Sequence, residues 1–156
     1  MTEKFVGPNH EDLVSPLNSL GMIDAYKARV QMSHDEFARA EGIARMPDNG
    51  TLLNQVLLNE ADLELAAGTP AHAAVFLQES HDLLSKAYPQ NANNQWRYAL
   101  WDSVKAELLA ATGDFDAALR LLTEAEPVIR QRFGPSGFYT SLTVRRRQFI
   151  EARTHT

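Results

Sequence analysis

Apolar residues recur every three or four positions along the chain, in runs interrupted by glycine and proline. This spacing is typical of amphipathic helices. Val, Ile and Thr do not alternate with polar residues between turn signals, so no strand is predicted. Gly68 and Gly113 each end a run, and Pro70 and Asp114 follow at positions suited to starting the next helix. The pattern predicts helices over residues 10–27, 31–45, 51–67, 70–87, 94–112, 115–132 and 138–154.

The runs form repeated units. Small and large residues follow Gly68 and Gly113 at the same intervals, so that these two copies are offset by 45 residues. The matching sets are Gly68, Ala73, Leu77 and Ser80, and Gly113, Ala118, Leu122 and Ala125. A further copy, with Ser33, Phe37 and Ala40, lies 40 residues before the first of these sets. Self-similarity at such a period is typical of stacked helical arrays.

Prolines recur in phase with these copies. Pro8, Pro47, Pro89 and Pro135 are separated by 39, 42 and 46 residues, each where a second helix is expected to end. We therefore predict three antiparallel helix pairs, over about residues 10–45, 51–88 and 94–133, and a final helix over about 138–154. The alternative is an irregular helical bundle whose spacings agree by chance.

Two sequence features disturb the first pair. Pro16 lies inside the first predicted helix, which either kinks there or begins with Ser15 as its cap and Pro16 as its first residue. Ser33 is followed three residues later by Glu36, the pattern of a capping box. That pattern predicts a second helix that begins two residues later than the repeat indicates.

The repeated residues resemble the tetratricopeptide repeat (TPR) pattern, in which small residues let paired helices approach and large ones fill the gap. The spacing of 40 to 45 residues and the phrases Gly7-Pro8-Asn9-His10 and Phe133-Gly134-Pro135-Ser136 look like the longer kinesin-light-chain type. The matching positions are Leu17, Leu20, Gly21, Ser33 and Phe37, then Leu57, Ala61, Ala73 and Leu77, then Ala106, Ala118, Leu122 and Ala125. The resemblance implies an all-α fold, an α-α superhelix formed by one domain over residues 1–156.

In this family the first helix of each pair lines a concave face that holds an extended or helical peptide. Carried over by matching positions, the resemblance implies a face formed by Asn18, Met22, Tyr26, Leu58, Asp62, Leu65, Ser103, Glu107, Ala110 and, on the last helix, Arg147. Asp62 and Glu107 would repel a C-terminal carboxylate and favour a peptide with Lys or Arg beside an apolar anchor. The exposed ends of such an array are candidates for self-association.

Composition narrows the classes of partner and site. Twenty acidic against 15 basic residues give a net charge of −5, which disfavours nucleic acid as the main ligand. Without cysteine, disulfides and thiolate sites are excluded. No apolar run is long enough to span a membrane, and the first residues, Met1 to Lys4, do not begin a signal peptide. We expect a cytoplasmic protein.

Motifs for catalysis, phosphate binding, calcium and zinc are missing, so we expect no cofactor and no metal. Glu60, Asp62 and Glu64 alternate along one helix and cannot converge, which favours a solvated acidic face. Arg145 to Arg147 are expected to pair with acidic neighbours, and Trp96, Tyr98 and Trp101 to fill the core or to anchor a peptide. We expect solvent-facing positions for the five histidines, His10, His34, His72, His81 and His155.

The favoured interpretation is a non-catalytic module that binds a protein or peptide, within a longer protein. Similar repeats occur in bacterial signalling proteins, for example beyond a serine/threonine kinase domain. The alternative is a small-molecule sensor or small regulatory enzyme that uses the groove as a pocket. An enzyme would need converging titratable groups, and the sequence shows none.

Overall fold

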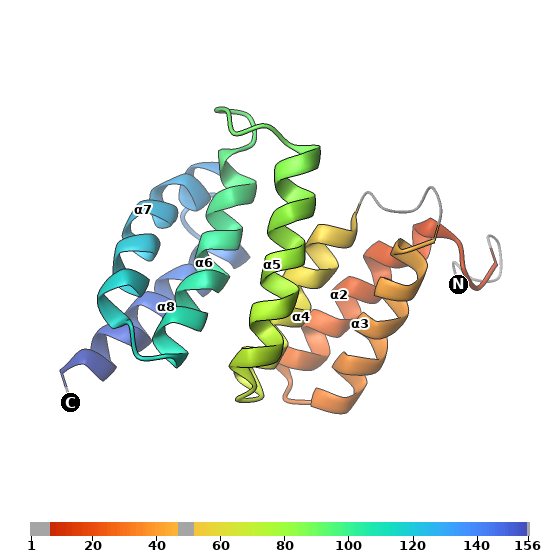
Figure 1. Ribbon diagram of the computed structural model, residues 1–156, viewed down its shortest axis with the longest axis horizontal. Helices are drawn as coiled ribbons and strands as arrows, with labels where there is room; N and C mark the ends of the chain where they lie inside the picture. Colours follow the sequence, from red (N-terminus) through yellow and green to blue (C-terminus); the bar gives the residue numbers. More distant parts are fainter. Residues whose placement is uncertain (1–6, 47–51, 156) are drawn as a thin grey trace. The chain divides into compact units, whose positions relative to one another are not determined.

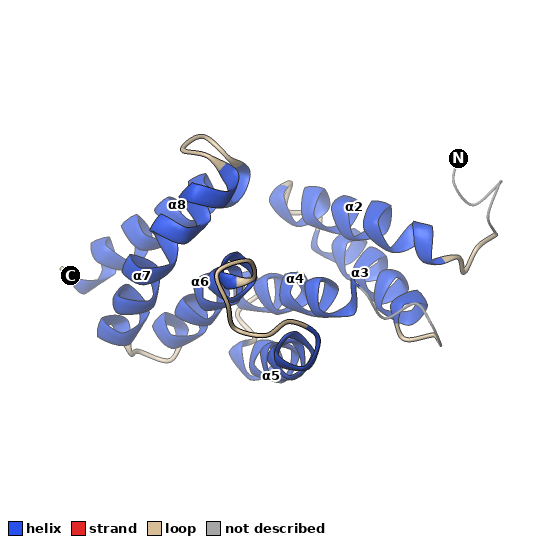
Figure 2. Ribbon diagram, turned by 90° about the horizontal axis from the view of Figure 1, so that it is seen from above, coloured by secondary structure: helices blue, strands red, loops and turns tan. Residues whose placement is uncertain are grey.

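The computed structural model describes residues 7–46 and 52–155, and every regular element in these ranges is helical (Figure 2). The predicted helices are confirmed to within a few residues at each end, and 70–87 and 138–154 match residue for residue. The start predicted at Thr51 and the boundary at Pro47 lie outside the described residues. In chain order the elements are η1 (Glu11–Leu13), α2 (Val14–Tyr26), α3 (Val30–Ala44), α4 (Leu53–Ala66), α5 (Pro70–Ala87), α6 (Gln95–Ala111), α7 (Phe115–Phe133) and α8 (Phe138–Thr154) (Figure 1).

The same turn closes α2, α4 and α6. Ala28, Gly68 and Gly113 have φ of 58°, 80° and 93°, the left-handed conformation that ends many helices. The amide that follows each of them donates to a carbonyl five residues back: Arg29 N to Asp24 O at 2.8 Å, Thr69 N to Glu64 O at 2.9 Å, and Asp114 N to Leu109 O at 2.9 Å. The turns are spaced 40 and 45 residues apart, which are the offsets of the sequence copies.

The structure differs from the predictions at both Pro16 and Ser33. The α2 helix begins at Val14, so Pro16 lies in its first turn, where a missing N–H costs nothing. Neither a kink nor a start at Pro16 is needed. The prediction of a capping box at Ser33 is wrong, because α3 begins at Val30 and Ser33 is fully buried within this helix. The Ser33 hydroxyl donates to the Gly21 carbonyl at 2.7 Å, across the contact between α2 and α3.

Burial follows the repeat. The three positions of each copy are buried, with at most 3% of each residue exposed: Ser33, Phe37 and Ala40, then Ala73, Leu77 and Ser80, then Ala118, Leu122 and Ala125. The predicted use of these positions in packing is thereby confirmed. A Cβ at Gly21 would come within 2.6 Å of the Phe37 ring, so α2 and α3 approach too closely there for a larger residue.

The chain divides into two compact units, Met1–Leu83 (unit 1) and Leu84–Thr156 (unit 2), and the division falls within α5. In unit 1, α3 packs against both α2 and α4 (Figure 1). In unit 2, α7 packs against both α6 and α8. Their cores include Val14, Leu17, Ala40, Ile43, Val56 and Leu57 in unit 1 and Ala106, Ala110, Ala118, Leu122 and Ile150 in unit 2. In the described part of the chain, no helix is both long and apolar enough to cross a membrane.

Candidate functional site

Six of the predicted binding residues lie on α2 and α4 of unit 1. Asn59 Nδ2 donates to Asn18 Oδ1 at 2.8 Å and thereby links the two helices. Residues four apart share one face of a helix, so Met22 and Tyr26 continue the face of Asn18 along α2. We call the set the unit 1 strip; it consists of Asn18, Met22 and Tyr26 on α2 and Leu58, Asp62 and Leu65 on α4.

Exposure varies along the unit 1 strip. Tyr26 is 67% exposed, whereas Leu58 is only 7% exposed and contributes to the core. Met22, Asp62 and Leu65 are half-buried. The strip therefore includes a thioether, a phenol, an aliphatic side chain and one carboxylate that are all at least partly exposed. Such a surface can hold an apolar side chain next to a positive charge.

The predicted residues of unit 2 are less accessible. Ser103 is 1% exposed and Ala110 2% exposed, so neither contributes a side chain to the surface. The Ser103 hydroxyl accepts a hydrogen bond from Arg146 Nη1 at 2.9 Å and lies 3.3 Å from the Thr143 hydroxyl. Glu107 is half-buried, and its carboxylate lies 3.5 Å from Arg146 Nε. In this unit the side chains thus link α6 to α8.

Arg146, rather than the predicted Arg147, lies beside the predicted α6 residues. Arg147 contacts α7, where its Nε donates to Glu126 Oε2 at 2.8 Å, and its Nη1 donates to Glu151 at 3.0 Å. Although burial alone would raise the pKa of Glu126, hydrogen bonds from Arg147 and Arg130 hold it below its ordinary value. The expectation that these arginines pair with acidic neighbours is confirmed for Arg146 and Arg147.

The acidic residues of α4 do not form the solvated face predicted for them. Glu60 and Glu64 are only 7% and 9% exposed, because α3 packs over this side of α4. Asp62 points elsewhere and stays half-exposed, so the three carboxylates do not converge. Burial, followed by the nearby carboxylate of Glu41, raises the pKa of Glu60 to about 8. Glu60 therefore carries a proton at neutral pH.

Two histidines lie beside Glu64; the His72 side chain is 72% exposed and that of His34 38%, so both still reach solvent as predicted, but their closeness to Glu64 was not predicted. His34 Nδ1 is 3.6 Å from Glu64 Oε1, and His72 Nδ1 is 3.3 Å from Glu64 Oε2. The three side chains come from α3, α4 and α5, so no local spacing could have indicated the cluster. The sequence repeat does indicate a carboxylate at this position, because Asp24 is equivalent to Glu64 at the 40-residue offset. Each of these carboxylates bonds to the residue five positions later, Arg29 or Thr69.

Aromatic rings and guanidinium groups gather in unit 2. The guanidinium carbon of Arg97 lies 3.9 Å from the Tyr88 ring centroid and 4.3 Å from that of Trp96. Arg132 approaches Trp96 at 4.8 Å, and Phe133 meets it edge-on at 5.8 Å. Trp96 is half-buried among these groups, an arrangement intermediate between the predicted core and anchor roles.

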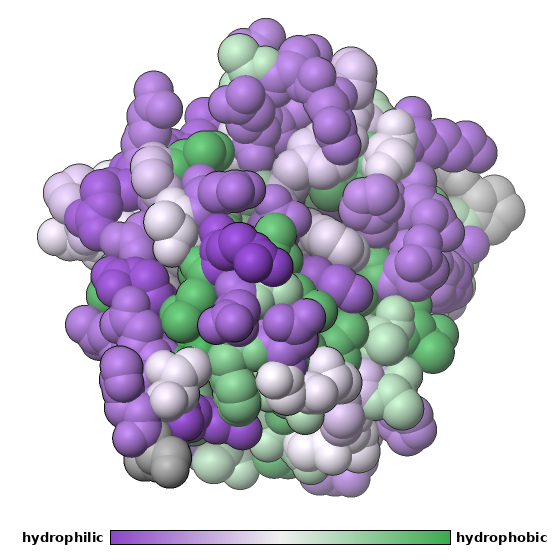
Figure 3. All heavy atoms as spheres, turned by 60° about the vertical axis from the view of Figure 1, so that its left-hand side comes forward, coloured by the Kyte–Doolittle hydropathy of each residue, from purple (hydrophilic) through white to green (hydrophobic). Residues whose placement is uncertain are grey.

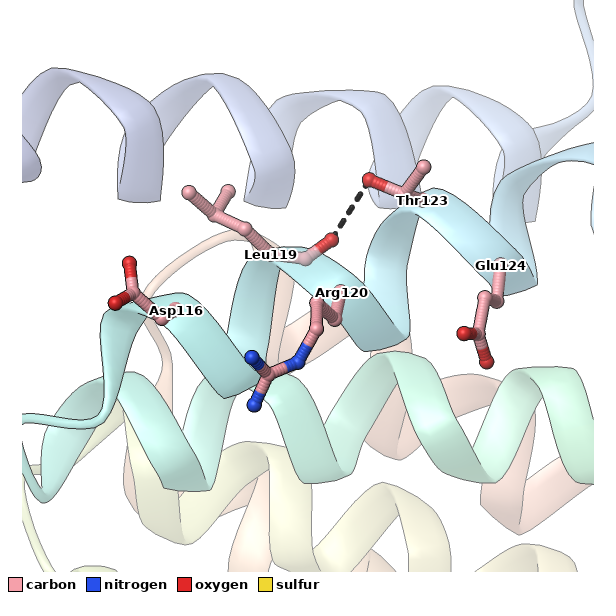
Figure 4. A pocket seen from close by; sticks show the side chains of 5 residues that line it. All are labelled: Asp116, Leu119, Arg120, Thr123 and Glu124. Carbon is pink, nitrogen blue, oxygen red and sulfur yellow. Dashed lines mark hydrogen bonds between the residues drawn. The ribbon is translucent and has the colours of Figure 1, made fainter.

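A shallow depression of about 400 Å³ lies on the outer side of α7 (Figure 4). Its lining consists of Asp116, Leu119, Arg120, Thr123 and Glu124. Asp116 and Glu124 are eight residues apart on one helix, which separates them by about 12 Å along its axis. The Thr123 hydroxyl donates to the Leu119 carbonyl at 2.8 Å. The charged groups are therefore spread along the helix and do not converge on one point.

Among the described residues, no group of three or more His, Asp or Glu side chains is placed to hold a metal ion. Figure 3 shows a face of the molecule on which hydrophobic residues are interspersed among hydrophilic ones. No protein-family model matches the sequence, and no curated protein matches it.

Proposed function

We propose that the chain is a TPR-like helical-repeat module that binds a protein or peptide partner without catalysing a reaction. The observation that carries the proposal is the threefold recurrence of one turn and one set of buried positions at offsets of 40 and 45 residues. Stacked repeats of this type expose the first helices of successive pairs as a continuous binding surface. In unit 1 these helices are α2 and α4, which carry the unit 1 strip.

The chemistry of the unit 1 strip favours a basic peptide with an apolar anchor. Met22 and Leu65 supply adaptable apolar contact area, and Tyr26 adds a rigid ring with a polar tip. Asp62 on α4 supplies the negative charge of the strip. The carboxylate attracts Lys or Arg and repels an acidic ligand, so binding should weaken as the salt concentration rises.

Selection from a random peptide library tests this proposal. We expect the chain to enrich peptides that carry Lys or Arg next to Leu, Met or an aromatic residue. Asp62→Lys should shift the preference toward acidic peptides and weaken the selected basic ones at least about ten-fold. Asp82→Lys makes the same charge change on an exposed part of α5 and serves as the control. Equal binding by both variants would exclude the strip from recognition.

A further inference from the structure

An apolar face of α2 is left uncovered by the described residues. Leu20 and Ile23 are each 47% exposed, and Pro16 is exposed on the same side of the helix. Val14 and Gly21, on the opposite side of α2, are buried, and the neighbouring helices α3 and α4 lie on one side of α2 in Figure 2. Two large aliphatic side chains one helical turn apart thus form an exposed stripe, which we call the α2 stripe.

The equivalent face of α4 is buried in a helix that packs against another helix. At the 40-residue offset, Pro16, Leu20 and Ile23 of α2 correspond to Val56, Glu60 and Leu63 of α4. These three residues are 0%, 7% and 3% exposed, in the helix that packs against α3. In α2 the acidic residue is replaced by leucine, so the stripe is more apolar than its covered counterpart. It has the composition of a helix-packing face.

The charges at the two ends of the α2 stripe indicate its occupant. Glu11 and Asp12 precede the helix and are exposed, and Lys27 follows it and is also exposed. In an antiparallel pair of α2 helices, the acidic end of each copy meets the basic end of the other. Helix dipoles also favour this orientation. A surface that complements itself in this way can form an isologous dimer.

We propose that the chain forms a homodimer through antiparallel contact of α2 with α2 of a second copy. Asp12 of one copy then faces Lys27 of the other, and Pro16 faces Ile23. Ser19 lies opposite Leu20 at the two-fold axis, where its small side chain allows the helices to approach closely. The dimer leaves the face of Met22 and Asp62 to the proposed peptide ligand, so the two proposals can fail separately.

Analytical ultracentrifugation over a range of protein concentrations tests the dimer. We expect a concentration-dependent dimer for the unaltered chain. Leu20→Glu should shift it to monomer, because it buries like charges near the two-fold axis. Val75→Glu alters an equally hydrophobic residue, 67% exposed on α5, and should leave the dimer intact. Circular dichroism should show the same helix content for all three proteins.

Charge reversal tests the antiparallel register. Asp12→Lys should weaken dimerisation at least about ten-fold, since both symmetric contacts become repulsive. Lys27→Asp should do the same, and the double variant should recover the original affinity. Because the chain has no cysteine, Ser19→Cys provides a single thiol near the axis, which should form a disulfide dimer faster than Ala71→Cys on α5.

Three outcomes would overturn the proposal. The unaltered chain could remain monomeric at all concentrations, or it could dimerise equally well as Leu20→Glu. A dimer that the double charge variant fails to restore would also reject the antiparallel register. Throughout, Leu20→Glu should retain the peptide preference of the unaltered chain, which separates loss of the dimer from failure of the unit 1 strip.

Discussion

Unit 1 and unit 2 bury ionisable side chains of opposite type. Among the described residues, unit 1 buries three carboxyl groups, Asp24, Glu60 and Glu64, whereas the buried ionisable side chain of unit 2 is Arg146. Arg146 reaches both a hydroxyl and a carboxylate on α6, so its charge is compensated within the unit. Glu60 is instead desolvated by burial and lies beside a second carboxyl group, Glu41, and both effects raise its pKa.

The difference between the buried side chains of the two units follows from the groups on the helix that packs against each of them. A guanidinium group has several donors in one plane and can bridge two helices while remaining charged. A carboxyl group that is desolvated by burial and lies near another carboxylate is more stable in its protonated form. The contact between α6 and α8 therefore contains a charged guanidinium group, whereas the contact between α3 and α4 contains a carboxyl group whose pKa is raised. Substitutions at Arg146 and Glu60 should consequently have opposite effects on stability.

The largest expected effect is at Arg146. Arg146→Ala removes a side chain that is 7% exposed and leaves Ser103 and Glu107 without its hydrogen bond and charge. We expect the free energy of unfolding to fall by about 2–3 kcal/mol, below the full cost of breaking a buried pair because Glu107 is partly exposed. Urea denaturation measures this change in the free energy of unfolding.

Arg145→Ala is the matched control for this change. Arg145 is the neighbouring residue on α8 and is exposed, so its removal should alter stability by no more than about 0.5 kcal/mol. Equal losses for the two variants would mean that the contact between α6 and α8 does not depend on the buried guanidinium.

A smaller effect of opposite sign is expected at Glu60. Its pKa is about 8 in the folded protein, against an ordinary value of 4.5. Between these pH values the folded state keeps the proton and the unfolded chain releases it, so stability decreases as pH rises. Glu60→Gln is neutral throughout and removes this penalty. It should become more stable than the unaltered chain by about 1–2 kcal/mol between pH 5 and pH 8.

Thermal denaturation at several pH values checks the prediction for Glu60. The advantage of Glu60→Gln should increase steadily over this window. Glu124→Gln, on an exposed part of α7, should show no such increase. A constant difference between Glu60→Gln and the unaltered chain would show that Glu60 titrates normally in the folded protein.

Most of the fold could be predicted because glycine, proline and small residues recur at fixed offsets, and these residues act locally on the backbone. Ser33 misled the prediction because its capping pattern is local, whereas its burial arises from contact with Gly21 on another helix. The burial of Glu60 has the same kind of cause. A helical pattern shows which residues share a face but not whether a neighbouring helix covers that face.

The contribution of Arg147 to the binding face stays a prediction, but Arg146 rather than Arg147 contacts the predicted residues of α6. Arg147 contacts Glu126 on α7 and Glu151 on its own helix, whereas Arg146 lies 3.5 Å from Glu107. The spacing along the chain does not indicate which of two adjacent arginines will meet a helix that is distant in sequence.

The smallest effect is expected at the turn between α2 and α3, where Ala28 has the left-handed conformation that glycine adopts at the two later turns. Ala28→Gly relieves the steric strain of the Cβ but increases the freedom of the unfolded chain. We expect a net gain of about 0.5–1 kcal/mol. The reverse change, Gly68→Ala, should cost about 1 kcal/mol through the backbone alone, because a Cβ there meets no atom within 4 Å. Ala38→Gly, at an exposed position inside α3, should lose about 1 kcal/mol and provides the control for glycine in a helix. Chemical denaturation of the three variants tests whether the turn at Ala28 is strained. If Ala28→Gly is destabilised as much as Ala38→Gly, this turn is not strained. The three turns would then be equivalent only in their hydrogen bonds.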